Sequence, residues 1–311
     1  MSQNTQFYTG FGKFGSMGVL PVYAGTGINV PMNWQIPQIL GNYVQINYCD
    51  GIRMPALMVN FSPFDQSLGL FNDASGGLLY YLLERTSGVT HDTISLGTVE
   101  FWDGRLNYQI GGAKLESLTL ATSRGDQLRV ASAFVGTSLT LSEVAPTWAD
   151  FNANARIIAY DWINFSGALA NIVASFSLTY SNNHTPDPSL NGTWWPSQVN
   201  ASTATASFSI TTQAADYGSA GQNIPYNGPL ANGANSTLLC SPPSFPYGSG
   251  YGAGNVSFQL RTGPLLNQTP HNGAATAPRN MKSFAYSILG STSRWTSASS
   301  NPLITKVSGG F

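Results

Sequence analysis

The residues that could carry acid–base or metal chemistry are few in this chain and lie far apart. The three histidines, His91, His184 and His271, each stand beside turn-forming residues, and none has the HxxxH spacing of a metal-binding helix. Exposed loop positions are the simplest interpretation of all three. Asp92 and Glu100 could form a carboxylate pair for hydrolysis, but they flank separate elements without an activating neighbour in the sequence.

Two glycine-containing segments and two cysteines complete the search for chemistry. Gly10-Phe11-Gly12 and Gly25-Thr26-Gly27 look like fragments of nucleotide-binding loops, but neither follows a buried strand or opens a helix. Cys49 and Cys240 lack CxxC spacing, so they favour neither a metal site nor a disulfide framework. The sequence thus predicts no catalytic residue, no cofactor and no metal, and a glycosidase or esterase is the least favoured class.

Large apolar side chains suggest binding rather than catalysis. Trp194 and Trp195 are adjacent, and such a pair can stack on sugars or anchor a protein interface. We favour the subunit contact, and the sugar platform stays open. A loop over residues 62–73 is unusually apolar, although its side chains could equally cap the core. The candidate inter-subunit contacts are Trp34, Phe64, Leu68, Leu70, Phe71, Trp194 and Trp195.

Charge is scarce over the whole chain. Asp, Glu, Lys and Arg make up 9% of the 311 residues and the formal net charge is -1, whereas soluble domains carry about 25% charged residues. A solitary protein normally keeps a net charge that resists self-association, so we expect surfaces that neighbours cover. The 13 basic residues are scattered singly, which disfavours binding to nucleic-acid phosphates.

Neither a membrane segment nor a leader is expected. The apolar runs are shorter than the roughly 20 residues that cross a bilayer. Residues 1–18 lack the continuous apolar core of a secretory signal. We therefore expect a protein made and kept in a cytoplasm, without membrane contact.

The elements that position these residues are mostly strands, because the hydrophobic period is mostly two. Asp103-Gly104 predicts a hairpin with a type I′ turn, which needs positive φ. A short helix is expected over residues 76–87, where four leucines share one face and Gly88 ends the pattern. The predicted strands cover residues 44–48, 56–61, 99–102, 106–110, 115–120, 128–135, 172–180, 204–210 and 256–260.

These elements predict a mainly β fold, a two-sheet sandwich or barrel of about ten strands with one short flanking α-helix. Residues 1–40 are expected to form an N-terminal arm. Residues 41–311 form a single domain in two related halves, about 41–142 and 156–311. The segments 181–199 and 214–254 are rich in Gly, Pro and Asn and predict loops, the second unusually long.

Two short motifs connect the halves. Ser117-Leu118-Thr119-Leu120 and Ser175-Phe176-Ser177-Leu178 each place large apolar residues on one face of a strand and hydroxyls on the other. The shared pattern suggests an internal duplication in which each half supplies one sheet. A hydroxyl-lined face could line a water-filled bore or lie against the sheet of another subunit.

Longer motifs run through both halves of the chain. In the first half they are the helix near residue 78, Gly112-Ala113-Lys114-Leu115-Glu116-Ser117-Leu118-Thr119-Leu120, Gly125-Asp126-Gln127-Leu128 and Phe134-Val135-Gly136. In the second half they are Val173-Ala174-Ser175-Phe176-Ser177-Leu178-Thr179-Tyr180-Ser181-Asn182-Asn183, Asn191-Gly192, Pro196 and Ala206-Ser207-Phe208-Ser209-Ile210. These motifs resemble those of the major tail tube proteins of long-tailed bacteriophages. The resemblance covers about residues 41–212 and continues more weakly through 256–261.

This resemblance implies a structural subunit of the virion tail, assembled in the host cytoplasm. It implies a tail-tube fold and homo-oligomerisation as hexameric rings, stacked into a conduit for DNA delivery. The implied partners are tape-measure, baseplate or tip and tail terminator proteins, and viral DNA would pass without sequence-specific binding. Two alternatives remain: a carbohydrate-binding β-sandwich, such as an adhesin or receptor-binding tail protein, and the inner tube of a contractile tail or secretion system.

Overall fold

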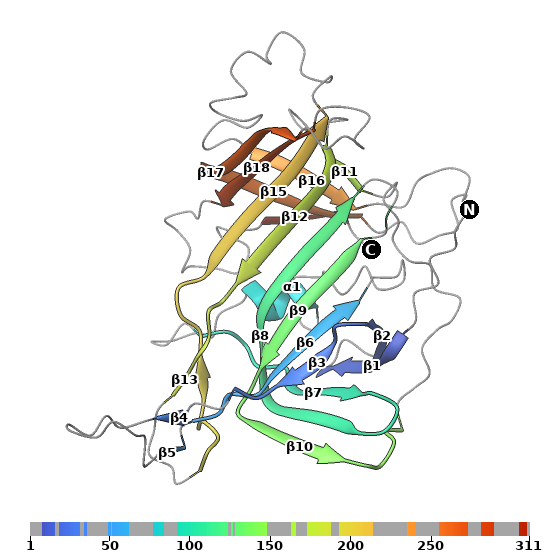
Figure 1. Cartoon of the computed structure of the whole chain (residues 1–311), viewed down its shortest axis with the longest axis vertical. Coiled ribbons are helices and arrows are strands. Elements are labelled where there is room, and N and C mark those ends of the chain that lie inside the picture. The colour runs from blue at the N-terminus through green and yellow to red at the C-terminus, as the bar shows by residue number, and fades with distance from the viewer. Residues whose placement is uncertain are drawn as a thin grey trace, which may run out of the picture.

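The chain folds almost entirely into β-strands in the computed structural model (Figure 1). The structure describes residues 8–15, 19–31, 34–35, 49–50, 52–61, 77–83, 92–123, 126, 128–147, 163–165, 173–187, 193–213, 235–240, 255–272, 281–288 and 305–309. Within them lies one helix, α1 (Leu78–Leu83). The strands are β1 (Tyr8–Phe14), β2 (Val19–Tyr23), β3 (Gly27–Asn29), β4 (Trp34–Gln35), β5 (Cys49–Asp50), β6 (Ala56–Phe61), β7 (Gly97–Trp102), β8 (Asn107–Ser123), β9 (Arg129–Val135), β10 (Ser138–Ser142), β11 (Ile163–Phe165), β12 (Val173–Ser181), β13 (Thr185–Pro186), β14 (Val199–Asn200), β15 (Thr205–Gln213), β16 (Asn235–Cys240), β17 (Asn255–Asn272), β18 (Met281–Ile288) and β19 (Thr305–Gly309).

One large antiparallel sheet of 15 strands dominates the molecule. Its main order is β11-β16-β17-β18-β15-β12-β8-β7-β1-β2, and β4–β5 and β13–β14 form two small separate sheets. The mainly β prediction and the single short helix are confirmed for the described part of the chain, which holds more strands than the ten or so expected. The order ends at β11 and β2, so these pairings do not describe a closed barrel.

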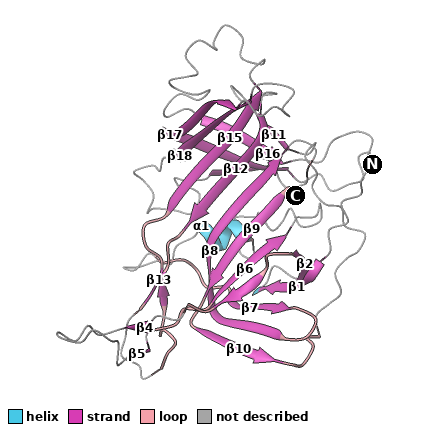
Figure 2. Cartoon of the chain, viewed as in Figure 1, coloured by secondary structure: helices cyan, strands magenta, loops and turns pink. Residues whose placement is uncertain are grey.

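Strand β8 is shared by two regions of the sheet. Its first residues pair with β7 on one side and β10 on the other, and its later residues pair with β9 and β12. Gly112 lies between the two regions and has a φ of 59°, a backbone conformation that favours glycine. Figure 2 shows the two regions at different heights along β8.

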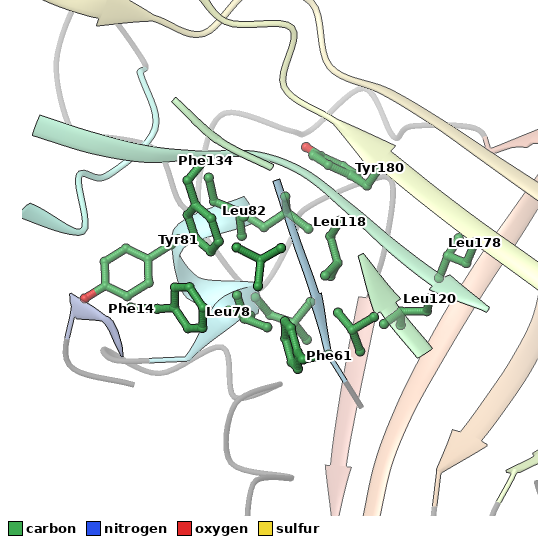
Figure 3. Close-up of a cluster of buried hydrophobic side chains, with 14 of the residues drawn as sticks. Phe14, Phe61, Leu78, Tyr81, Leu82, Leu118, Leu120, Phe134, Leu178 and Tyr180 are labelled. Carbon is green, nitrogen blue, oxygen red and sulfur yellow. The ribbon is translucent and has the colours of Figure 1, made fainter. Parts of the chain in front are cut away.

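The hydrophobic core lies between β1, the strands around β8 and helix α1 (Figure 3). The Phe14 ring of β1 stacks on Phe134 of β9, with 5.1 Å between ring centroids, and lies 6.2 Å from Phe61 of β6. Leu78 and Leu82 of α1 are buried in the same cluster. Burial of such side chains contributes roughly 1.5–3 kcal/mol each, so α1 is held mainly by its packing.

Period-two alternation sets which face of the sheet is buried. In β12, Phe176, Leu178 and Tyr180 are buried while the intervening residues are partly exposed. The buried row continues through Phe208 of β15 and Tyr286 of β18. Strand β6 was predicted at residues 56–61 and occupies them, since Leu57, Val59 and Phe61 alternate inward.

The predicted hairpin exists, but its turn differs from the prediction. β7 and β8 pair from Trp102 and Asn107 onward, and the Asp103 N–H donates to the Leu106 carbonyl at 3.2 Å. The tip is therefore Gly104-Arg105, and only Gly104 has positive φ, at 96°. Asp103 instead accepts hydrogen bonds from the N–H groups of Arg105 and Leu106 through its Oδ1. A type I′ turn with Asp103 at positive φ was thus wrong.

Several segments differ from the expected loops. Residues predicted as an N-terminal arm contribute β1, β2 and β3 to the large sheet, and they bury Phe14 and Val22. Strand β16 lies within the predicted loop 214–254. Several predictions fall partly or wholly outside the described residues: strand 44–48, loop 62–73, both ends of helix 76–87, part of loop 181–199 and most of loop 214–254.

The two predicted halves meet in one sheet instead of forming a sheet each. The matching motifs pair directly, with Leu120 opposite Leu178 and Thr119 opposite Thr179. None of the described helices is long and apolar enough to span a membrane.

Candidate functional site

The outward face of the large sheet is lined by small hydroxyl side chains. It is built on the later part of β8 and on β12, β15 and β18, and its residues alternate with the buried apolar ones. We call this surface the hydroxyl face. It consists of Ser117, Thr119, Ala121, Ser123, Ser175, Ser177, Thr179, Ser181, Thr205, Ser207, Ser209, Thr211, Ser283, Ala285 and Ser287, each at least partly exposed.

Cross-strand register places these hydroxyls in rows. One row runs Thr119, Thr179, Ser207 and Ser287 across four neighbouring strands. The Thr119 and Thr179 hydroxyls are 3.1 Å apart, as are those of Thr211 and Ser283. Threonine pairs of this kind stabilise a sheet modestly. The result is a regular polar surface without a charged side chain.

Charge appears at one margin of this face. Next to β8, β9 places Ala131 and Ala133 beside Thr119 and Ser117, and Arg129 beside Ala121. Arg129 Nη2 lies 3.0 Å from Asp126 Oδ2, an exposed ion pair. Its positive charge is therefore partly offset. Among the described residues, no group of three or more His, Cys, Asp or Glu could hold a metal ion.

A buried polar cluster lies where β8 meets the segment after β12. The His184 ring Nδ1 lies 2.5 Å from Glu116 Oε2, and its Nε2 lies 2.7 Å from the Thr93 hydroxyl. Because a carboxylate only accepts hydrogen bonds, the Nδ1–H of His184 is the donor in this contact and Glu116 is the acceptor. The expectation of an exposed loop histidine is wrong for His184, which is 7% exposed. His91 and His271 give no test, since their side chains lie outside the described set.

An ion pair adjoins this cluster. The Lys114 ammonium contacts Asp92 Oδ2 and also donates to the Val199 carbonyl. Asp92 Oδ1 accepts from the N–H groups of Thr93 and Ala201, each at 2.8 Å. The predicted Asp92 and Glu100 pair belongs to two separate networks, since Glu100 Oε2 instead accepts from the amides of two β8 residues, Asn107 and Gln109.

The surroundings favour the ionised form of both carboxyls. Burial raises the pKa of Asp92, but hydrogen bonds from Lys114 and Ala201 outweigh it and hold the pKa below the ordinary 3.8. Burial likewise raises the pKa of Glu116, and hydrogen bonds from the ring and main chain of His184 hold it below the ordinary 4.5. Both groups therefore stabilise the folded state when they are ionised.

Thr93, His184 and Glu116 have the connectivity of a hydroxyl–imidazole–carboxylate relay. A relay of this kind activates a hydroxyl only where substrate reaches it, and Thr93 is 1% exposed. Both polar ends of the imidazole are satisfied within the protein. In this arrangement the cluster joins segments that are distant in sequence, and we interpret it as structural.

The two tryptophans differ in exposure. Trp194 is 60% exposed, and the Arg53 guanidinium carbon lies 4.6 Å from its ring centroid. The main-chain N–H of Arg53 donates to the Trp194 carbonyl at 2.8 Å. Trp195 is partly buried. Of the two tryptophans, Trp194 therefore offers the larger apolar surface to a partner.

The other predicted contact residues are only partly covered by the structure. Trp34 lies in β4, which pairs with β5. Phe64, Leu68, Leu70 and Phe71 lie outside the described residues.

No family model matches the chain, and no curated protein does either.

Sequence reasoning missed the polar cluster and the role of Arg53. Lys114 and Glu116 gave a weak signal, because they are the two charged residues of a strand that has no other. Their partners Asp92 and His184 come from distant segments. The hydroxyl face, in contrast, follows directly from the alternation of the two motifs.

Proposed function

We propose that this protein is a structural subunit of a bacteriophage tail tube, polymerising as stacked rings that form a hollow conduit for DNA. The observation that carries the proposal is the uncharged hydroxyl face, together with a chain in which only 9% of residues are charged. The resemblance of the sequence motifs to tail tube proteins supports the same assignment.

The chemistry of the hydroxyl face suits the bore of such a tube. A dry contact between sheets draws its free energy from buried apolar area, and this face offers mainly Ser, Thr and Ala. Hydroxyls keep a layer of water. A phosphate backbone binds proteins chiefly through Lys and Arg that release counterions. A face without such residues lets DNA pass without holding it.

The proposed assembly is a hexameric ring of two-sheet, tail-tube type subunits. Strand β8 supports this reading because it pairs within two regions of the sheet, and both regions contribute residues to one hydrophobic cluster. Rings would close by edge-to-edge pairing of the sheets of neighbouring copies around a central axis, which also removes exposed strand edges. Tape-measure, baseplate or tip and tail terminator proteins would be the partners in a virion tail assembled in the host cytoplasm.

Negative-stain electron microscopy of the purified chain tests this proposal. We expect rings or hollow filaments of uniform width. A chain that stays monomeric in sedimentation at high concentration would contradict it. The inner tube of a contractile tail or secretion system would give similar images, and the proteins recovered with the tubes from infected cells separate these cases.

A carbohydrate-binding β-sandwich is the second candidate, favoured by the exposed ring of Trp194. This alternative expects a monomer or trimer that is retained on a glycan array. Retention that Trp194→Ala abolishes, in a protein without rings, would select it over the tube.

A further inference from the structure

Trp194 is fixed in position by contacts from a distant part of the chain. The guanidinium of Arg53 stacks on its ring, and the main chains of the two residues are joined by a 2.8 Å hydrogen bond. Beside it, the Thr193 hydroxyl donates to the Trp195 carbonyl at 2.8 Å. Contacts of residues 53 and 193–195 therefore hold the exposed ring in place.

The base of this loop is also closed. β13 and β14 pair as Thr185 with Asn200 and Pro186 with Val199, and the Gln198 side chain donates to Asp187 Oδ2 at 3.0 Å. Just beyond, the Val199 carbonyl and Ala201 N–H join the buried polar cluster. Figure 1 shows β13 with β4 and β5 at the lower left, away from the upper strands.

The geometry points to Trp194 as an anchor that docks on a second copy of this chain within the tube. This inference rests on the proposed function. Exposed aromatic residues held in one conformation are favoured as binding hot spots, because little side-chain entropy is lost on docking. Arg53 is the positioning residue, since it covers one side of the indole and leaves the remainder for the partner.

A copy of the chain fits this anchor better than a sugar. A small-molecule site usually combines an aromatic surface with a few polar groups that fix the orientation of the ligand. Near Trp194, the Thr193 hydroxyl is engaged by a carbonyl and the Gln198 amide by Asp187. With 13 basic and 14 acidic residues among 311, ion pairs can supply few of the contacts between copies, which leaves more of the binding to apolar side chains such as Trp194.

Three variants of the full chain test the inference through the critical concentration for assembly, measured by sedimentation and electron microscopy. Trp194→Ala should raise it at least about 30-fold, the effect of losing a hot spot. Arg53→Gln should raise it about threefold, through loss of the cation–π contact. Leu266→Ala is the control, because Leu266 is 61% exposed against 60% for Trp194.

The outcomes separate the two proposals. Circular dichroism should be unchanged in all three variants, and thermal unfolding should stay cooperative and shift only by the small amount that the loss of a surface contact causes, which shows that each folds. If the Trp194→Ala protein assembles at the wild-type concentration, the anchor proposal is wrong and the tube proposal still stands. The same conclusion follows if Leu266→Ala raises the critical concentration as much as Trp194→Ala does. A wild-type chain that never assembles overturns the tube and the anchor together.

Discussion

The position of one residue in β8 decides the surroundings of His184. The pairing of β8 with β9 shifts register between Leu115 and Ser117, so Glu116 occupies an irregularity in the ladder. Such bulges re-aim a side chain, and Glu116 accepts from both the ring and the main chain of His184. The sequence shows the alternation of β8 but gives no local sign of the bulge, so the partner of His184 could not be predicted.

Acid should destabilise the fold through Asp92 and Glu116. Their pKa values are lowered in the folded state, so each adds stability above its ordinary pKa and loses it as pH falls through the folded value. Their contribution to the free energy of unfolding should therefore fall as the pH drops below about 4.5. Urea titrations across this range measure it.

Glu116→Gln isolates the contribution of one carboxylate. At pH 7 the variant should lose about 1.5–3 kcal/mol, the worth of hydrogen bonds to a charged group. It should also show a shallower fall in stability below pH 4.5. An unchanged acid slope would mean that Glu116 is not held by His184 in solution.

At the scale of elements, glycines are one reason why the sequence predicts an N-terminal arm where the structure has strands. Gly10 and Gly12 suggested flexibility, but a Cβ on Gly10 would lie 2.1 Å from the Trp102 carbonyl oxygen. Glycine in a strand often marks a close backbone approach, and here it lets β1 lie beside β7. Single-residue patterns do not distinguish this use from a flexible segment. Strand β6, which lacks Gly and Pro, was found at its predicted bounds.

Gly112 should be required for the change of direction within β8. Its φ is 59°, and a Cβ there would lie 2.5 Å from Thr137 Oγ1. Gly112→Ala should therefore cost about 1–3 kcal/mol. Gly27→Ala is the matched control, because its Cβ would meet nothing within 4 Å, and it should change stability by under about 0.5 kcal/mol. Chemical denaturation of both variants makes the comparison, and equal losses would contradict it.

The hydroxyl face can be tested by adding one charge to it. Thr179→Lys should leave the fold and the tubes intact and should make the tubes retain DNA, more weakly as salt rises, because lysines on each subunit would release counterions. Thr179→Gln adds length without charge and should retain none. A filter-binding assay gives the measurement. Loss of assembly in both variants would instead place this face between subunits.

At the scale of the whole molecule, scarce charge predicts how assembly responds to salt. With charged groups at 9% of residues and a net charge of -1, ionic repulsion and attraction between copies are small. The critical concentration should change less than about threefold between about 0.05 and 0.5 M NaCl. Light scattering across a salt series measures it. A steep rise with salt would indicate that ion pairs hold the copies together.

The joining of the two halves through β8 and β12 also has a mechanical consequence. Every residue of β12 from Ser175 to Ser181 pairs with β8 in antiparallel register. Tension along these strands would load all of these hydrogen bonds in shear at once, whereas a pull across them would break the bonds one after another. A wall built from such subunits would resist elongation along the strand direction far better than peeling.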